Sequence, residues 1–382
     1  MPGFGGLYSP VRMFSFAVQH TSARARAGLL ETPHGVVETP AFMPVGTAGA
    51  VKALTLRDVE DLRPQILLAN TYHLMLRPGD AVVAGLGGLH GFTGWRGPFL
   101  TDSGGYQVLS LKGLRRLSEE GVSFRSHIDG SSHLLTPERA VEIQMNLGAD
   151  IVMPLDECPP SDATPEALKA STERTTRWAE RSQAALKRND QWMFGIVQGG
   201  CDLGLRERSA ADLLALDFPG YAIGGLAVGE PAEARESVLG HLDPVLPEGK
   251  PRYLMGVGTP EDMLSAVSRG IDLFDCVLPT RNGRNGQLFT SRGRLNIRNA
   301  RYLTDPRPPD PDCRCFTCQR TSRAYLRHLH LAREITAATL MTLHNLAHYL
   351  DTLKKMRESI RSGQFETFRR ETLRKLTASD AP

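Results

Sequence analysis

Three carboxylates in this 382-residue chain stand where they could perform catalysis. Asp102, Asp156 and Asp275 each end or follow a short apolar run, and the amides Asn70 and Gln198 end two similar runs. A single aspartate in such a place is often only a helix cap, but three carboxylates are too costly to bury for packing alone. We therefore expect them to meet in one site, where paired carboxylates provide a nucleophile and a general acid or base.

Three cysteines form a second candidate site. Cys313, Cys315 and Cys318 lie within six positions, too close for a disulfide framework, and their thiolates would supply most of a tetrahedral zinc shell. A fourth protein ligand would close the shell and make one zinc ion per chain structural rather than catalytic. Spacing alone leaves four candidates for that ligand: His328, His330, His344 and His348.

Eight short apolar runs in the first three quarters of the chain could position the carboxylates. Continuous apolar runs separated by helix-length intervals are typical of buried parallel strands. Eight such units predict a (β/α)8 barrel, an α/β fold with active sites at the carboxyl ends of its strands, and a doubly wound sheet is the alternative. The runs are Ala41–Val45, Ile66–Asn70, Pro98–Asp102, Ile151–Asp156, Met193–Gln198, Tyr221–Gly225, Arg252–Gly256 and Ile271–Cys276.

Capping signals support this alternation of strands and helices. Thr136, Thr164 and Thr259 each begin a Thr-Pro-Glu sequence, which places an N-cap residue before a proline at the first helical position. Thr55 and Asp58 form a similar start. The repeating unit is therefore strand, short loop and capped helix.

The loop after Thr101 combines Asp102 with the glycine pair Gly104-Gly105 and with Tyr106. Glycines let the backbone approach a ligand, and an aromatic ring beside them can stack on a planar base. A tight turn with a core tyrosine explains the fragment equally well. The glycine-rich loop 224–230 has the same two interpretations.

Charge is distributed unevenly along the chain. Residues 281–382 hold 20 Lys and Arg against 9 Asp and Glu, a net charge of +11, whereas residues 1–280 carry −8. A basic end of this kind favours a polyanionic partner such as nucleic acid. No run of about 20 apolar residues exists, and the N-terminus lacks the pattern of a secretion signal, so we expect a cytoplasmic protein without a membrane span.

Changes in composition suggest four parts. Residues 1–13 are rich in Gly and Pro, and this composition predicts a disordered extension. Prolines mark the entry to the cysteine motif. The expected division is the extension 1–13, a catalytic barrel at 14–300 with a hairpin-like insertion around 108–135, a zinc-binding subdomain at 301–350, and a basic helical segment at 351–382 that packs back on the barrel.

Longer motifs recur along the chain: Thr39–Gly46, Ala69–Leu74, the Asp102 loop, Asp156–Cys158, Val197–Gly200, the Gly225 loop, Met255–Gly258, Phe274–Cys276 and Pro279–Asn282. In these motifs, and from about Phe14 to near the C-terminus, the sequence closely resembles the bacterial tRNA-guanine transglycosylases, also called the queuine tRNA-ribosyltransferase family. The family fold is a (β/α)8 barrel with a zinc subdomain.

The resemblance implies a reaction. Enzymes of this family exchange guanine at the wobble position of a tRNA anticodon for 7-aminomethyl-7-deazaguanine, a step of queuosine biosynthesis. They act by double displacement through a covalent enzyme–RNA intermediate. On this chain, Asp275 matches the nucleophile and Asp102 matches the general acid and base.

The resemblance also implies binding residues. Asp156, Gln198 and the Gly225 backbone would hydrogen-bond the base, while Tyr106 and Met255 would sandwich it. Cys158 and Val228 match the bacterial pattern, which implies the aminomethyl base rather than free queuine. The residues expected to bind substrate are Asp102, Ser103, Tyr106, Asp156, Cys158, Gln198, Gly225, Leu226 and Met255.

The resemblance further implies that Arg281 and Arg284 contact tRNA and that two chains form a homodimer. The zinc ligands that it implies are Cys313, Cys315, Cys318 and His344.

Two departures from the family pattern and two alternative functions stay open. Pro159–Ala163 differs from the usual stretch beside the base pocket, and Thr259 replaces a common Lys, which could weaken one phosphate contact. A barrel glycosidase or nucleosidase would use the same carboxylates but would hydrolyse and would not need a basic, zinc-binding tail. A non-catalytic RNA-binding subunit would lack Asp102 or Asp275, and both are present.

Overall fold

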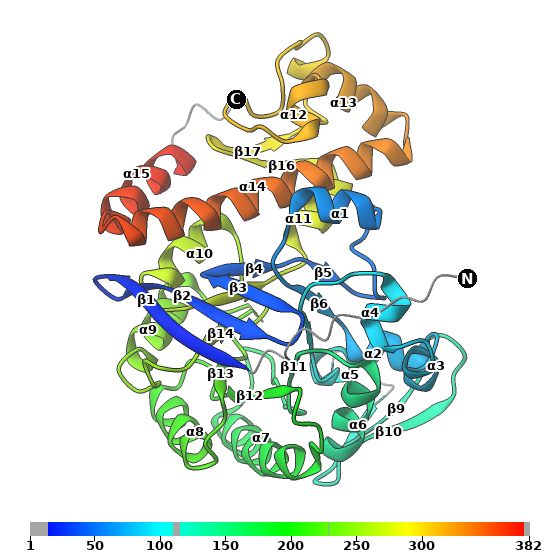
Figure 1. Ribbon diagram of the computed structural model, residues 1–382, viewed down its shortest axis with the longest axis vertical. Helices are drawn as coiled ribbons and strands as arrows, with labels where there is room; N and C mark the ends of the chain where they lie inside the picture. Colours follow the sequence, from blue (N-terminus) through cyan, green and yellow to red (C-terminus); the bar gives the residue numbers. More distant parts are fainter. Residues whose placement is uncertain (1–13, 110–114, 228, 378–382) are drawn as a thin grey trace, which may run out of the picture.

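The chain forms a parallel β-barrel surrounded by helices (Figure 1). The computed structural model describes residues 14–109, 115–227 and 229–377, so the expected extension at 1–13 and Val228 lie outside the described residues. In pairing order, the barrel strands are β4 (Ala41–Met43), β15 (Leu273–Asp275), β14 (Arg252–Leu254), β13 (Gly220–Ile223), β12 (Trp192–Val197), β11 (Ile151–Val152), β7 (Phe99–Thr101), β6 (Leu67–Ala69) and β5 (Val45–Gly46).

Pro44 divides the first barrel strand into β4 and β5. β4 pairs in parallel with β15, the last strand, and β5 pairs in parallel with β6. These pairings join the two ends of the sheet, which excludes the open doubly wound alternative. Each of the eight predicted runs overlaps a barrel strand, and the (β/α)8 prediction is confirmed.

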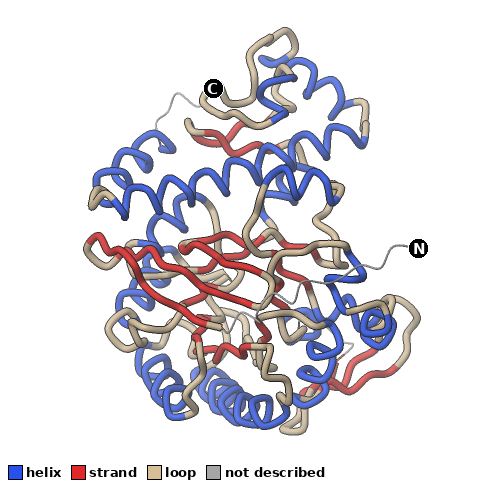
Figure 2. Tube along the Cα trace, viewed as in Figure 1, coloured by secondary structure: helices blue, strands red, loops and turns tan. Residues whose placement is uncertain are grey.

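Helices cover the outside of the strands (Figure 2). The predicted N-caps are confirmed: the side chains of Thr136, Thr164 and Thr259 each accept a hydrogen bond from a backbone N–H of the following helix. Thr55 and Asp58 form the reciprocal capping box. The barrel helices are α1 (Leu56–Leu62), α2 (Thr71–Leu76), α3 (Asp80–Gly85), α4 (Gly88–Thr93), α5 (Gly105–Leu109), α6 (Pro137–Leu147), α7 (Pro165–Ala185), α8 (Leu203–Ala215), α9 (Ala232–Leu242), α10 (Pro260–Val267) and α11 (Leu278–Arg284).

The interval around 108–135 holds a small antiparallel sheet. Its strands are β8 (Arg115–Leu117), β9 (Val122–Arg125) and β10 (Ser132–Leu135), in the order β10-β9-β8. Val122 and Phe124 are buried while Ser123 and Arg125 are exposed, which is the alternation of a half-buried strand. The sheet is thus a three-stranded meander rather than a single hairpin.

A second antiparallel sheet precedes the barrel, and the sequence analysis did not predict it. It consists of β1 (Ser15–Ser22), β2 (Ala25–Thr32) and β3 (Gly35–Thr39). Leu30 and Val37 pack in the same apolar cluster as Leu68 and Ile196 of the barrel interior. The sheet therefore covers the N-terminal end of the barrel, opposite the strand ends that carry the carboxylates.

The C-terminal quarter has an apolar core of its own, which includes Leu288, Leu295 and Tyr302. This core begins before the expected boundary at 300, because the first hairpin belongs to it. The elements are β16 (Gln287–Thr290), β17 (Gly293–Asn296), a 3-10 turn (Ala300–Tyr302), α12 (Phe316–Arg320), α13 (Arg323–Leu331), α14 (Ile335–Arg361) and α15 (Phe365–Thr377).

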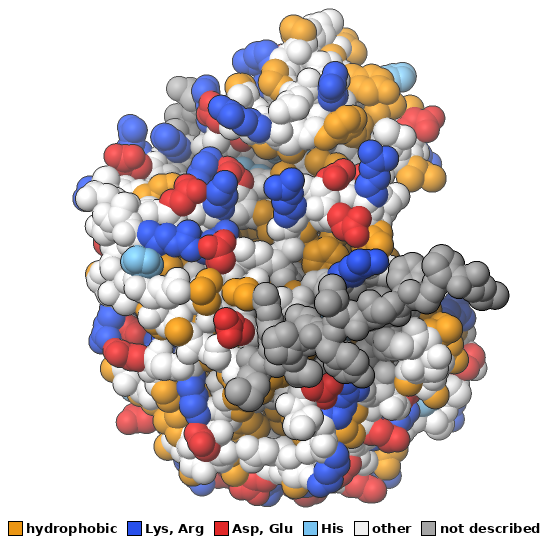
Figure 3. All heavy atoms as spheres, in the orientation of Figure 1, with side chains coloured by type: hydrophobic (Ala, Val, Ile, Leu, Met, Phe, Trp, Pro, Cys, Tyr) orange, Lys and Arg blue, Asp and Glu red, His pale blue; other side chains and the backbone are white. Residues whose placement is uncertain are grey.

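Helix α14 continues through the boundary expected at 350, because one helix serves both parts of the molecule. Its first half contributes Met341 to the C-terminal core, whereas Leu353 and Met356 join the main barrel core. The Arg357 guanidinium donates to the Pro40 carbonyl at 2.7 Å beside the first barrel strand. Lys and Arg side chains recur over this upper part of the molecule, interspersed with acidic ones (Figure 3). None of the helices in the described ranges has the length and apolar character that a bilayer crossing requires.

Candidate active site and metal centre

The predicted polar residues gather at the C-terminal mouth of the barrel. Asp102 follows β7, Asp156 follows β11 and Gln198 follows β12, while Asp275 is the last residue of β15. Carboxyl ends of parallel strands share one edge of a barrel, so residues distant in sequence become neighbours there. Hydrogen bonds and charge interactions join these groups to one another.

Asp102 is held by neutral donors from two elements. The backbone N–H of Thr71 donates to its Oδ1 at 2.8 Å, and the amides of Asn70 and Gln107 donate to its Oδ2. Burial raises its pKa to about 6 although these hydrogen bonds oppose the shift, and the nearby charge of Asp275 adds to it. A carboxyl group with this pKa can both give and take a proton near neutral pH.

Asp275 is fixed through one oxygen. Its Oδ1 accepts hydrogen bonds from the hydroxyl of Tyr253 at 2.6 Å and from the backbone N–H of Gly256 at 2.7 Å. Burial raises its pKa, and these two donors counteract the shift. Both hydrogen bonds that the described residues donate to Asp275 end on Oδ1, so Oδ2 is the oxygen that can contact a substrate.

Asp156 and Gln198 form a buried polar pair. The Gln198 amide donates to Asp156 Oδ2 at 2.8 Å, and the Ser103 hydroxyl donates to Oδ1 at 3.4 Å. Burial raises the pKa of Asp156 to about 6. Gln198 Oε1 is buried and has no hydrogen-bond partner among the described residues. A buried acceptor of this kind is costly unless a ligand supplies a donor.

Arg206 positions the loops on either side of Gln198. Fully buried on α8, it donates to the carbonyl oxygens of Val197, Gly200 and Gly224 at 2.7 to 2.8 Å. These bonds fix the chain before Gly225. Only glycine fits at this position, because its φ is +69° and a Cβ atom here would lie 2.6 Å from Gln198 Oε1. The sequence analysis missed Arg206, although a lone arginine on the apolar face of an amphipathic helix was a usable signal.

The remaining predicted substrate residues lie on the segments that follow β7, β11, β13 and β14, at the C-terminal end of the barrel. Tyr106 is exposed at the start of α5, Met255 follows β14 and is half-buried, and Leu226 is fully buried. Cys158 is half-buried, and burial raises the pKa of its thiol to about 12, so it remains a neutral thiol.

A pocket of about 160 Å³ borders this region. The segment Pro159–Ala163, which departs from the family pattern, contributes to its wall. A larger hollow of about 760 Å³ lies between α1 and α14, away from the carboxylates, and its mixed lining offers no comparable set of catalytic groups. The smaller pocket is lined by Pro159, Pro160, Ser161, Ala163, Leu168, Gln198, Gly200, Cys201, Asp202, Gly225 and Glu230.

The two predicted RNA-binding arginines follow Asp275 on α11. Arg281 is exposed, whereas Arg284 is half-buried and its buried Nη1 has no partner among the described residues. Thr259, the other departure from the family pattern, uses its hydroxyl as the N-cap of α10.

Three cysteines and one histidine form a group that can hold a metal ion: Cys313, Cys315, Cys318 and His344, whose ligand atoms lie within 4.8 Å of one another. His344 Nδ1 is 3.2 Å from the Cys318 sulfur and 3.6 Å from the Cys315 sulfur. Its Nε2 lies 2.8 Å from the Phe289 carbonyl, which only accepts, so the proton is on Nε2 and the Nδ1 lone pair faces the thiols. Among the four histidines that spacing left open, the structure brings His344 to the cysteines.

Comparison with known proteins identifies the family. The family model described as queuine tRNA-ribosyltransferase matches residues 21–378. The chain belongs to the queuine tRNA-ribosyltransferase family. It is 54% identical to the queuine tRNA-ribosyltransferase of Thermus thermophilus over 369 residues, and this aligned region covers 97% of this chain and 96% of that protein. It is 55% identical over 362 residues to the protein of that name from Pelotomaculum thermopropionicum, covering 95% and 98%.

Membership of the queuine tRNA-ribosyltransferase family confirms the resemblance that the motifs indicated. Among the groups that hold Asp102 and Asp275, the sequence analysis noted Asn70 as a strand end but gave no role to Thr71, Gln107 or Tyr253. Thr71 lies inside the matching motif Ala69–Leu74, Gln107 lies in the Asp102 loop, and Tyr253 lies two residues before Met255, so position in or beside the motifs was the available signal.

Proposed function

We propose that this protein exchanges guanine at the wobble position of a tRNA anticodon for 7-aminomethyl-7-deazaguanine, in queuosine biosynthesis. The observation that carries the proposal is the pair Asp102 and Asp275, two carboxylates without cationic partners among the described residues, at the mouth of a barrel from this family. Exchange at an anomeric carbon needs such a pair: one group to form a covalent bond and one to move a proton.

Asp275 acts as the nucleophile. Tyr253 and Gly256 hold Oδ1, so Oδ2 can approach the ribose C1′. As the bond between Asp275 and C1′ forms, the bond from C1′ to guanine breaks, and Asp102 gives its proton to the departing base. The incoming base then loses its ring N–H proton to Asp102 and attacks C1′, which releases Asp275. Two displacements retain the configuration at C1′.

Asp156, Gln198 and the Gly225 backbone recognise the base. The unpaired Oε1 of Gln198 and the carboxyl group of Asp156 can accept hydrogen bonds from the exocyclic and ring N–H groups of a guanine edge. A base without these donors would leave the acceptors buried and unpaired, which supplies discrimination. Tyr106 and Met255 flank the base, and Ser103, Cys158 and Leu226 complete the pocket beside them.

The basic C-terminal quarter binds tRNA, with Arg281 and Arg284 beside the catalytic loop. Both follow Asp275 by fewer than ten residues on one short helix, so a ribose at Asp275 places neighbouring phosphates within their reach. We also propose a homodimer, because large apolar side chains such as Leu331 and Ile335 are exposed around the junction of α13 and α14. Sedimentation at several protein concentrations tests that assembly.

The metal is zinc, one ion per chain, and its role is structural. Three thiolates and one imidazole would close the shell of a tetrahedral ion and leave no position for substrate or water. The ligands come from the loop before α12, from α12 and from α14, so the ion would join the cysteine loop to the long helix. After dialysis against a mild chelator, metal analysis should give one tightly held zinc per chain, and Cys318→Ala should lose that zinc and the folded C-terminal core together.

The decisive experiment supplies tRNA and labelled guanine to the purified protein. Incorporation of label into tRNA supports exchange, whereas release of guanine without incorporation supports the hydrolytic alternative. A covalent RNA adduct should survive on a denaturing gel for the parent protein and be absent from Asp275→Ala. A variant that still formed the adduct would reassign the nucleophile.

A further inference from the structure

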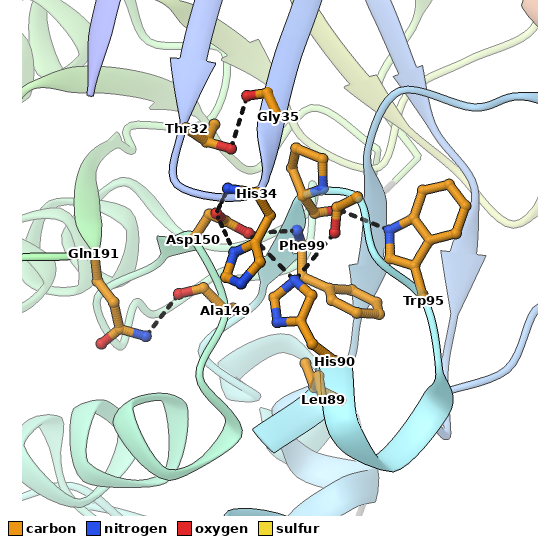
Figure 4. A network of polar contacts seen from close by, with 12 residues as sticks. Thr32, His34, Gly35, Leu89, His90, Trp95, Phe99, Ala149, Asp150 and Gln191 are labelled. Carbon is orange, nitrogen blue, oxygen red and sulfur yellow. Dashed lines mark hydrogen bonds and ion pairs between the residues drawn. The ribbon is translucent and has the colours of Figure 1, made fainter. Parts of the chain in front are cut away.

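A second cluster of metal-ligating side chains lies at the N-terminal end of the barrel, opposite the mouth (Figure 4). His34 lies in the turn between β2 and β3, His90 lies on α4, and Asp150 directly precedes β11. These three residues take no part in the proposed reaction. They come from three elements that are distant in sequence, and the fold brings their side chains together.

The ligand atoms are spaced for one ion. His34 Nδ1 is 2.8 Å from Asp150 Oδ1, His90 Nε2 is 3.7 Å from Asp150 Oδ2, and all three ligand atoms lie within 4.8 Å of one another. In a tetrahedral shell with bonds of about 2.0 to 2.1 Å, ligand atoms lie about 3.3 Å apart. One of the two nitrogen-to-oxygen distances is shorter than this value and the other is longer, so small side-chain movements would bring both distances to the spacing of a tetrahedral shell.

The carboxylate is already oriented for such a role. Asp150 is fully buried, and the backbone N–H groups of Phe99 and His34 donate to its two oxygens at 2.8 and 3.2 Å. In known metal sites, hydrogen bonds to a ligating carboxylate fix the orientation of the carboxylate, and these two backbone donors can do the same for Asp150. Asp150 thus presents its remaining lone pairs toward the two imidazoles.

The histidines need a limited rearrangement. Their rings stack at 3.5 Å with an angle of 15°, so one ring must turn before both lone pairs can point at one ion. His34 can turn because its side chain is 40% exposed on a loop. His90 Nε2 faces the Gly97 carbonyl at 3.0 Å, and an ion would replace that hydrogen bond. The exposed side of His34 also gives an ion and its water ligands access.

We propose that His34, His90 and Asp150 form a second metal site, which binds a divalent transition-metal ion such as zinc or nickel through two imidazoles and one carboxylate. Imidazole is a favoured ligand of these ions, and water completes the shell. To coordinate the ion, a ring nitrogen must be deprotonated: a proton on it is released to solvent, and the neutral imidazole keeps its proton on the other ring nitrogen. The bound ion connects the β2–β3 turn to α4 and β11, and so clamps the N-terminal sheet onto the barrel.

The test uses the full-length chain without a histidine tag, with its cysteine site loaded with zinc, and Ni²⁺ as the probe in calorimetry. We expect one further ion per chain and a rise of the melting temperature with Ni²⁺ concentration, since a ligand of the native state stabilises it. His34→Ala and His90→Ala should each weaken this binding at least about tenfold, because each removes one of three protein ligands. His20→Ala, which removes an exposed histidine of β1 in the same sheet, should bind Ni²⁺ like the parent.

Absence of a further ion at millimolar Ni²⁺ and Zn²⁺ would overturn the proposal. So would an ion that both His34→Ala and His90→Ala retain, or one that His20→Ala loses. If His90→Ala does not fold, His34→Ala decides alone, since His34 lies on a loop with its side chain 40% exposed. Electron paramagnetic resonance of bound Cu²⁺ adds an independent criterion: coupling to two imidazole nitrogens is expected, and coupling to none contradicts the site.

Discussion

The two ends of the barrel differ in what surrounds their buried acidic groups. At the N-terminal end, the Asp272 carboxylate accepts hydrogen bonds from the Arg26 guanidinium, and Asp243 accepts one from Arg252 at 3.0 Å. At the mouth, Asp102, Asp156 and Asp275 accept hydrogen bonds only from neutral groups among the described residues. A carboxylate paired with arginine holds elements together, whereas one buried without a cation is available for proton transfer or bond formation.

The carboxyl groups at the mouth and the ion pairs at the opposite end should affect the stability of the protein in opposite ways. Burial raises the pKa of the mouth carboxyl groups, so ionising them costs the native state free energy. Breaking an ion pair at the opposite end leaves a buried charge without a partner and also costs free energy. We therefore expect substitutions of the mouth carboxylates to abolish chemistry without unfolding the protein, and substitutions in the ion pairs of Asp272 and Asp243 to do the reverse.

The largest effect is expected for Asp275→Asn. Loss of the nucleophile should lower the exchange rate by about 10⁴-fold or more, as removal of an essential catalytic group does in other enzymes. The free energy of unfolding should stay the same or increase, because a desolvated carboxylate is replaced by an amide that can still accept from Tyr253. Exchange of labelled guanine and urea denaturation measure the two quantities. Marked destabilisation would show that Asp275 is mainly structural.

Asp272→Asn should give the opposite result. It leaves the buried Arg26 guanidinium without its counter-charge, and the free energy of unfolding should fall by about 3 to 5 kcal/mol. At a temperature where the variant is folded, its exchange rate per folded molecule should remain within about twofold of the parent, because the residue lies at the other end of the barrel. A loss of less than about 1 kcal/mol would remove the contrast between the two ends.

Asp102→Asn tests the raised pKa of the proton donor. The protonated form must expel guanine, so single-turnover adduct formation should decline as pH rises through about 6, and the variant should lose this decline along with about 10² to 10⁴ in rate. The sign for stability follows from the raised pKa. Between about pH 4 and 6 the native state holds this proton more tightly than the unfolded chain, so this carboxyl stabilises less as pH rises through that window.

In the variant, this contribution to the pH dependence of unfolding should disappear. Urea midpoints measured from pH 4 to 7 for the parent and for Asp102→Asn provide the check. Identical pH dependence in the two proteins would contradict a raised pKa at Asp102.

The smallest effect is expected at the rim of the mouth. Arg281→Ala should weaken tRNA binding and reduce the slope of log K against log salt by about 0.7, the contribution of one phosphate contact on a single strand. Lys187→Ala removes an exposed cation just after α7, at the N-terminal end, and should leave both quantities unchanged. Binding titrations over a range of salt concentrations separate the two variants. Equal slopes for parent and Arg281→Ala would place the anticodon elsewhere.

Much of the fold could be predicted from local pattern. The barrel strands are buried on both faces, so their apolar runs are continuous and easy to recognise, and the threonine caps mark helix starts through local hydrogen bonds. The N-terminal sheet could not be predicted in this way. Its buried positions include Ala25, Ala27 and Gly28, where close packing rather than side-chain hydrophobicity selects the residue: a Cβ on Gly28 would lie 2.6 Å from the Ala17 carbonyl oxygen.

By itself, the sequence determined the barrel, the cysteine motif and the residues that end the strands, because short-range patterns of burial, capping and spacing encode them. The cysteine spacing left four histidines open, and the family resemblance and the tertiary structure selected His344. Only the tertiary structure showed Arg206 beneath the Gly225 loop, and neutral donors rather than arginines around Asp102. These choices depend on contacts between elements far apart in the chain. The pKa values and hydrogen-bond partners of the site arise from those contacts, since burial and neighbouring charge act through space and not along the sequence.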